Sequence, residues 1–160
     1  MNVLIDTNVL LRLADEKHAM HLTASAAIEV YRRTKVLCIF PQNLYEFLVV
    51  ATRPLKVNGL DYTQSEAMGV IASLERFYKL VPETPAVYTH WKAILNDFVV
   101  NGKLGHDAHL VAGMLANGIT EILTFNDQDF IRFTGITTVN PKNVVVMSPP
   151  SDSSSSQSLG

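Results

Sequence analysis

Met1-Asn2-Val3-Leu4-Ile5-Asp6-Thr7-Asn8-Val9-Leu10-Leu11 opens the chain and places one carboxylate inside an apolar run. Residues 3–5 are typical of a short buried strand, and residues 9–13 of a helix that packs on it. An ionised Asp6 at this junction costs free energy unless a cation, a metal or backbone N–H groups compensate it. The carboxylate could instead cap the helix through the amides of Asn8 or Val9. The stretch alone leaves both explanations open.

Composition indicates an ordinary globular protein. The chain has 160 residues, of which 48% are hydrophobic and 18% charged, so we expect one domain over residues 1–147 and a disordered, Ser-rich tail over residues 148–160. The single cysteine, Cys38, can form neither an internal disulfide nor a thiolate zinc site. No apolar run reaches the roughly 18 residues of a membrane span, and no secretory signal is visible. We therefore expect a cytoplasmic protein without a membrane partner.

The balance of charge limits the function classes. Thirteen basic and 15 acidic residues give a net charge of −2. A module that binds nucleic acid by electrostatics alone is usually strongly basic, which argues against that class. A nuclease is compatible with this charge because its metal-binding carboxylates are themselves acidic. One basic cluster, Arg32-Arg33-Thr34-Lys35, ends a predicted helix; a solvated last turn explains it more simply than a phosphate contact.

Segments with strand and helix patterns alternate along the chain. Strands are predicted at residues 3–5, 36–40, 80–82 (a short strand or a bend), 119–124, 136–139 and 144–147. Helices are predicted from residue 9 and at 17–35, 41–51, 63–78, 84–101 and 106–117. This alternation predicts the α/β class: a three-layer α/β/α arrangement around a central, mainly parallel sheet.

Asp107 is the acid whose position most clearly indicates a functional role. It lies in the first turn of a predicted helix, where the helix dipole alone would favour an acid. At helical spacing, however, it shares a face with Leu110, Val111 and Met114, the face expected to pack on the core. An acid placed only for the dipole could face water instead.

Further acids follow the strand at residues 121–124. Asn126, Asp127 and Asp129 come directly after its end, where open parallel sheets bind ligands. Asp6 follows the first strand in the same way, so we expect acidic groups to gather at one edge of the sheet. Asn126 and Asp127 also suit a plain turn, so one of these side chains could have no further role.

Two other positions are harder to judge from their neighbours. Glu46 lies on a mixed helical face and, taken alone, suits a solvated side chain. His106 and His109 are three residues apart on one helix, a spacing that is usually structural or exposed rather than metal-binding. Asp6, Glu46 and the acids after residue 106 together offer hard oxygen ligands, which suit Mg²⁺ or Mn²⁺ and not zinc or copper.

Four blocks of this sequence, in this order, resemble the PIN-domain family, and in particular the VapC-like toxins of type II toxin–antitoxin pairs. The blocks are Asp6-Thr7-Asn8; Pro41-Gln42-Asn43-Leu44-Tyr45-Glu46-Phe47, continuing to Ala51-Thr52-Arg53-Pro54; His106-Asp107-Ala108; and Thr124-Phe125-Asn126-Asp127-Gln128-Asp129-Phe130. Each block is weak alone, but together they cover nearly all of residues 1–147.

The resemblance implies a PIN-like fold and a metal-dependent ribonuclease, with Asp6, Glu46, Asp107 and Asp129 as catalytic residues around Mg²⁺. In the last block the family has Asn or Asp at the position of Asn126 and an acid at that of Asp129, so Asp129 is favoured over Asp127. The residues implied to support the ligands or contact the substrate are Thr7, Asn8, Thr124, Asn126 and Asp127. The implied partners are RNA, a cognate antitoxin and a second copy of the chain, for which Tyr45, Phe47 and Val50 could supply apolar surface, although core packing explains them as well.

Two other functions compete with the nuclease. A phosphatase of the haloacid dehalogenase type would use Asp6 as nucleophile, but it expects a second Asp two residues later, where this chain has Asn8. A catalytically inactive PIN-like domain would bind RNA or a protein without cleaving. Because all four acidic positions are filled, the sequence disfavours this reading without excluding it.

Overall fold

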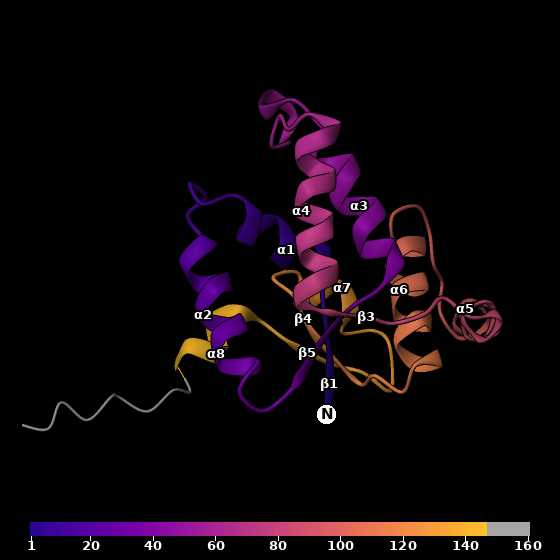
Figure 1. The fold of residues 1–160 in the computed structure, drawn as a ribbon. Coiled ribbons are helices and arrows are strands. Elements are labelled where there is room, and N and C mark those ends of the chain that lie inside the picture. The colour runs from indigo at the N-terminus through magenta and orange to yellow at the C-terminus, as the bar shows by residue number, and fades with distance from the viewer. Residues whose placement is uncertain (147–160) are drawn as a thin grey trace, which may run out of the picture.

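A five-stranded parallel sheet lies at the centre of the computed structural model, which describes residues 1–146 (Figure 1). Its strands are β1 (Asn2–Ile5), β2 (Val36–Ile39), β3 (Lys79–Leu80), β4 (Glu121–Leu123) and β5 (Thr137–Val139), in the order β3-β2-β1-β4-β5. Every neighbouring pair of these strands is parallel. The carboxyl ends of the strands therefore meet at one edge, which we call the carboxyl edge of the sheet.

Alternation along the buried strands divides the apolar core in two. Val3 and Ile5 of β1 face one helical layer, whereas Leu4, between them, faces the other. The first layer contains α1 (Thr7–Ala14), α2 (His21–Tyr31), α3 (Pro41–Ala51), α4 (Gln64–Phe77) and α8 (Pro141–Val146). The second contains α5 (Pro85–Asp97), α6 (Leu104–Ala116) and α7 (Asp127–Phe130). The predicted three-layer α/β/α fold is confirmed.

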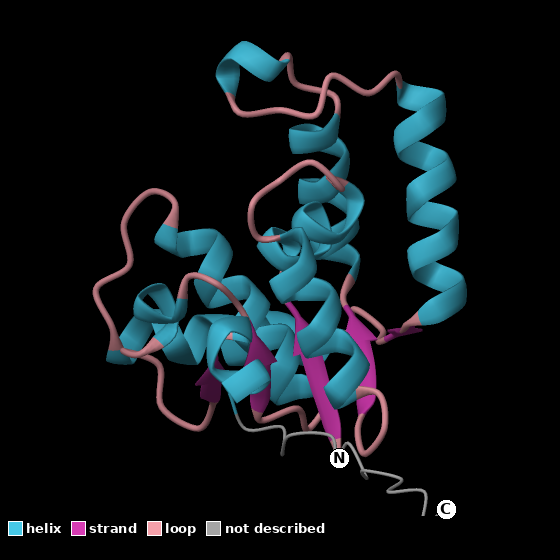
Figure 2. Ribbon diagram, turned by 90° about the vertical axis from the view of Figure 1, so that its left-hand side faces the viewer, coloured by secondary structure: helices cyan, strands magenta, loops and turns pink. Residues whose placement is uncertain are grey.

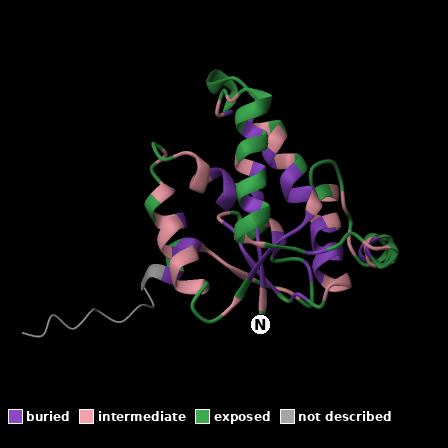
Figure 3. Ribbon diagram, viewed as in Figure 1, coloured by how far each residue is buried: buried purple, intermediate pink, exposed green. Residues whose placement is uncertain are grey.

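Helices α3 and α4 extend beyond the carboxyl edge of the sheet (Figure 2). The short 3-10 helix η1 (Leu55–Val57), which the sequence did not predict, lies in the connection between them. The outward face of α4 is largely exposed, while β1 and β4 at the centre of the sheet are largely buried (Figure 3). Among the helices of residues 1–146, none combines the length and apolar character needed to cross a membrane.

The late strand predicted at residues 144–147 is wrong. Val144 and its neighbours belong to α8, which begins at Pro141. The run of valines suggested a strand, but Pro141 suits a first helical turn and Val144 packs in the same core cluster as α2. Met147 and the predicted tail at residues 148–160 lie outside the described residues.

Several predicted boundaries also shift. The helix predicted at 17–35 is shorter, because α2 spans His21–Tyr31. The helix predicted to run to residue 101 ends at Asp97, and the third strand is Lys79–Leu80 rather than 80–82. The capping box predicted at Thr63 and Glu66 is confirmed: the Thr63 hydroxyl accepts from the Glu66 amide, and the Glu66 carboxylate accepts from the Thr63 amide.

Candidate functional site

Asp6 lies where β1 ends and α1 begins, at the carboxyl edge of the sheet. Its backbone N–H donates to the carbonyl of Leu123, which fixes it beside the end of β4. Its side chain is only 8% exposed and makes no capping hydrogen bond to α1, and the Asp6 backbone carbonyl accepts from the amides of Val9 and Leu10. The simple capping explanation therefore does not hold.

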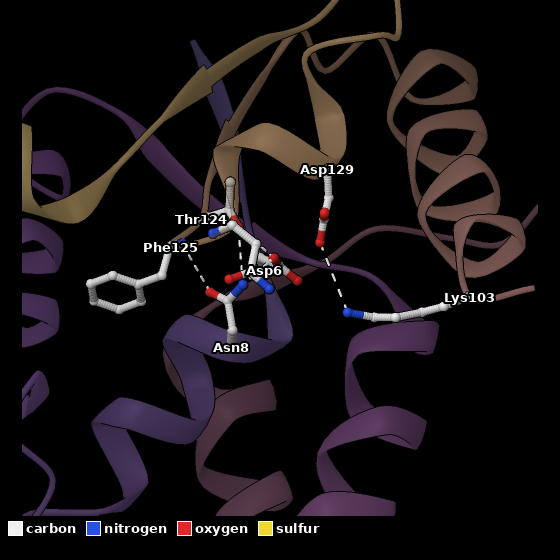
Figure 4. A network of polar contacts seen from close by, with 7 residues as sticks. Asp6, Asn8, Lys103, Thr124, Phe125 and Asp129 are labelled. Carbon is white, nitrogen blue, oxygen red and sulfur yellow. Dashed lines mark hydrogen bonds and ion pairs between the residues drawn. The ribbon is translucent and has the colours of Figure 1, made fainter. Parts of the chain in front are cut away.

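Two polar side chains hold the Asp6 carboxylate from one side (Figure 4). The Thr124 hydroxyl and the Asn8 amide nitrogen each donate to Asp6 Oδ2 over 2.6 Å. The Asn8 oxygen accepts from the backbone N–H of Phe125 at 3.1 Å, so α1 and the segment after β4 are joined at this point. Asn8 and Thr124, both predicted to support the site, therefore contact Asp6 directly.

Burial raises the pKa of Asp6 from 3.8 to about 6. The Thr124 hydroxyl opposes this by stabilising the ionised form, whereas the negative charges of Glu46 and Asp107 raise the pKa further. Near neutral pH the side chain is thus a buried carboxylate within the electrostatic reach of two other acids. A bound cation would strongly stabilise the ionised form of such a group.

Glu46 is not a free surface acid. The Thr7 hydroxyl donates to Glu46 Oε2 over 2.9 Å and itself accepts from the amide of the buried Asn43 at 3.2 Å. Asn43 in turn accepts the backbone N–H of Phe40, which joins the start of α3 to the end of β2. Helix α3 therefore presents Glu46 to α1 and the carboxyl edge, a placement that its mixed helical neighbours did not reveal.

A second set of contacts on Glu46 was missed in the sequence. Gln42 donates through Nε2 to Glu46 Oε1 over 2.8 Å and to the carbonyl of His106 over 2.9 Å. Gln42 Oε1 lies 2.6 Å from Nδ1 of His109, whose Nε2 lies 3.1 Å from Glu83 Oε1. The four-residue spacing of Gln42 and Glu46 on one helix was the available signal. His109 is thus engaged by a glutamine and a carboxylate.

Asp107 projects from the first turn of α6 and has one oxygen without a partner. Its Oδ2 is buried and forms no hydrogen bond with any described residue. Burial raises the pKa of Asp107, and the charges of Asp129 and Glu46 raise it further, against smaller opposite effects of Lys103 and His106. A buried carboxylate oxygen without a donor is costly, so this atom is a candidate ligand for a cation.

The three candidates after β4 differ in their surroundings. The charge of Asp129 raises the pKa of Asp107. The Asp129 carboxylate also lies 3.8 Å from the largely exposed ammonium of Lys103 (Figure 4). Asp127 instead accepts from the amide of Asn140 over 3.0 Å. The side chain of Asn126 is exposed, and its backbone N–H donates to the Thr124 hydroxyl. Asp129 is therefore the acid of this block whose charge raises the pKa of Asp107.

The described residues do not contain a preformed metal-binding site. Within residues 1–146, no three His, Cys, Asp or Glu side chains are grouped closely enough to hold an ion as they stand. His106 is mostly exposed and lies 3.8 Å from Glu46, and His109 is engaged elsewhere, as the sequence suggested for both. The structure places the charges of Glu46 and Asp107 where they raise the pKa of Asp6, and those of Asp129 and Glu46 where they raise the pKa of Asp107.

Comparison with known proteins gives one family match. The family model described as the PIN domain matches residues 3–136. Among curated proteins, none matches the chain.

Several solved structures share the fold at low sequence identity. VapBC2 from Rickettsia felis, bound to a DNA fragment from its promoter, aligns with a TM-score of 0.67 and 10% identity, covering 88% of this chain and 98% of that one. VapBC-1 from nontypeable Haemophilus influenzae aligns at 0.65 and 14%, with the same coverages. VapC20 from Mycobacterium tuberculosis, a toxin that cleaves the sarcin–ricin loop, aligns at 0.56 and 17%, covering 75% of this chain and 86% of that one. At these identities, the likeness concerns the fold.

Proposed function

The chain belongs to the PIN domain family, and we propose that it is an endoribonuclease that hydrolyses RNA phosphodiester bonds with a divalent metal ion, Mg²⁺ or alternatively Mn²⁺. The observation that carries the proposal is the unpartnered, buried Oδ2 of Asp107, set within electrostatic reach of the buried Asp6. Burying either of these carboxylates in its ionised form costs free energy when no cation is bound. Sharing a cation would remove both costs.

The donor set fits such an ion. Asp6, Asp107, Glu46 and Asp129 offer carboxylate oxygens, which hard cations such as Mg²⁺ prefer. Because no three of them form a closed set among the described residues, their side chains would have to approach one another to bind it. When bound, the ion would lower the pKa of a water and neutralise negative charge on the reacting phosphate.

The surrounding side chains have positioning roles in this proposal. Thr124 and Asn8 donate to one oxygen of Asp6, which leaves its other oxygen free of side-chain hydrogen bonds among the described residues. Thr7 and Gln42 each donate to one oxygen of Glu46 and so fix its orientation. Such hydrogen bonds hold ligands in place and commonly affect metal affinity. Asn126, which is exposed, could contact the substrate, and Asp127 would support the loop through Asn140.

The biological setting is also a proposal: a cytoplasmic toxin that pairs with a cognate antitoxin and forms a homodimer. It is supported by family membership and by fold neighbours that were solved as toxin–antitoxin complexes. Tyr45, Val49 and Met68, on α3 and α4, are exposed and could serve such contacts. Phe47, which the sequence had also offered for this purpose, is fully buried and belongs to the core.

Cleavage assays on matched variants test the proposal. Asp6→Asn and Asp107→Asn should each lower RNA cleavage by about a hundredfold or more, because each removes a charged metal ligand. Asp97→Asn, an exposed position at the end of α5, is the control and should cleave normally. Unchanged secondary structure by circular dichroism would show that the fold survives. Full cleavage by either site variant would reject the assignment of that carboxylate as a metal ligand. No cleavage by the parent protein would instead favour an inactive binding domain.

A further inference from the structure

A basic cavity lies at the opposite end of the sheet from the acidic site. It has a volume of about 540 Å³ and lies where β2 and β3 begin, next to the C-terminal ends of α2 and α4. Four of the chain's 13 lysines and arginines line it, namely Arg32, Lys35, Arg76 and Lys79. None of the described residues that line it is acidic.

The four cations differ in how firmly they are engaged. Lys35 is held between the carboxylate of Glu121, at 2.6 Å, and the ring of Tyr31, at 4.4 Å from its centroid. Arg32 pairs with Glu29 at the surface, an exchangeable contact because solvent-exposed ion pairs contribute little. Arg76 and Lys79 form no ion pair with any carboxylate of the described chain. The cavity therefore contains charge that the fold itself does not neutralise.

An exposed aromatic ring accompanies these cations. Phe77 lies between the two free cations in the stretch Arg76-Phe77-Tyr78-Lys79, lines the cavity, and is 76% exposed. Basic residues at helix ends are commonly explained by the helix dipole. That explanation accounts for Arg32 and Arg76 but not for a large ring left in water. Cations that track phosphates, combined with an aromatic ring on which a base can stack, are the elements of single-strand recognition.

We propose that this cavity is a second RNA-contact site, which binds the phosphodiester backbone of a single strand through Arg32, Arg76 and Lys79 while one base stacks on Phe77. The inference rests on the proposed function, since it assumes that RNA is the substrate. The site lies away from the cleaving carboxylates and holds a distant part of the RNA. It supplies the positive charge that the acidic site and the net charge of −2 lack.

The test measures RNA affinity separately from cleavage. A short fluorescent single-stranded RNA is titrated into the full chain carrying Asp6→Asn, and anisotropy is followed over a series of salt concentrations. Adding Arg76→Gln with Lys79→Gln should reduce the slope of log affinity against log salt by about 1.4, since each phosphate contact to a single strand contributes about 0.7. Adding Phe77→Ala should weaken binding about fivefold or more at constant salt.

A matched control distinguishes the effect of the cavity residues on RNA binding from the effect of the overall charge. Lys17→Gln with Lys56→Gln removes the same charge from exposed positions outside the cavity and should leave affinity and slope unchanged. Equal losses in the two double variants, or no loss in the cavity variant, would overturn the proposal. A fluorescent poly-glutamate peptide provides a further test. If binding of this peptide depends on Arg76 and Lys79 while RNA binding does not, the proposal is also overturned, because the cavity would then bind an acidic protein.

Failure of this proposal can be told apart from failure of the proposed function. The cavity variants, tested with Asp6 intact, should hydrolyse the small diester bis(p-nitrophenyl) phosphate at the parent rate, because that substrate is too short to reach the cavity. If the parent itself hydrolyses neither this diester nor RNA, the nuclease proposal fails. If it hydrolyses both and the cavity variants bind RNA like the parent, only the second site is rejected.

Discussion

The side-chain amide of Gln42 joins Glu46 to His109: its nitrogen donates to Glu46 Oε1 over 2.8 Å, and its oxygen lies 2.6 Å from His109 Nδ1. This connects α3 to α6, the two helices that carry Glu46 and Asp107. Because Gln42 is buried and both ends of its amide are engaged, it restricts where the Glu46 carboxylate can lie. The acidic site thus depends on a residue with no charge of its own.

Replacing Gln42 should impair metal binding without unfolding the protein. Gln42→Leu removes the donor to Glu46, and losses of about 10- to 100-fold in metal affinity or activity are typical for partners of this kind. Calorimetric titration with Mn²⁺ would measure the affinity, and Gln64→Leu, on the exposed first turn of α4, is the control. Unchanged Mn²⁺ affinity in Gln42→Leu would mean that Glu46 is not positioned in this way.

The contribution of Asp6 to the stability of the metal-free protein should fall as pH rises through the acidic range. The folded state holds the Asp6 proton more tightly than the unfolded chain, with a pKa of about 6 against 3.8. Asp6 therefore contributes stability below pH 3.8 that is lost as pH rises towards 6, amounting to about 3 kcal/mol by linkage. The raised pKa of Asp107 acts in the same direction.

Urea unfolding in chelator at several pH values would measure this effect. The difference in unfolding free energy between the parent and Asp6→Asn should shift across this range, because the variant lacks the titrating group. A saturating divalent ion should weaken the pH dependence by stabilising the ionised carboxylates. A pH-independent difference between the parent and Asp6→Asn would contradict the account of Asp6.

Removal of divalent ions should abolish activity reversibly. Nearby negative charges raise the pKa values of Asp6 and Asp107, so we expect a cation to bind before a phosphate can approach them. Chelator-treated protein should leave RNA intact, and added Mg²⁺ or Mn²⁺ should restore cleavage. Cleavage at full rate by protein shown to be free of metal would overturn the metal-dependent mechanism.

The close contact between Gly113 and Phe40 should be sensitive to a single methyl group. A Cβ at Gly113 would lie 2.8 Å from the Phe40 ring, closer than packed atoms tolerate. Gly113→Ala should therefore destabilise the fold by about 1–3 kcal/mol. Gly69→Ala, in open space on α4, should instead stabilise by about 0.4–1 kcal/mol. Urea denaturation distinguishes the two, and equal effects would show that Phe40 moves aside freely.

The layered fold was predictable because the sequence patterns are local and strong. Val3 to Ile5 form a buried apolar run, and Thr63 with Glu66 marks a helix start within four residues. The strand prediction at Val144 was wrong because β-branched residues favour strands when judged locally. The helical conformation of this segment depends on packing against α2, which is remote in sequence.

Strand ends predicted that Asp6 and the acids after β4 would lie at one edge of the sheet, whereas Glu46 was proposed from the resemblance; the residues that contact these acids were not all predictable. Gln42 and Asn43 are ordinary helical residues until α1 and α6 are placed beside them. Their contacts join residues 36 and 67 positions apart, at Thr7 and His109. The resemblance favoured Asp129 over Asp127, but the sequence gave no sign that Asp127 would accept a hydrogen bond from Asn140.

A crystal of the full chain grown with Mn²⁺ tests the central claim most directly, because the ion's anomalous scattering reports its position independently of activity. We predict a peak in direct contact with carboxylate oxygens of Asp6 and Asp107, with Glu46 and Asp129 facing it, and no such peak in Asp6→Asn crystals. A peak at other residues only, or none at saturating Mn²⁺, would contradict the account.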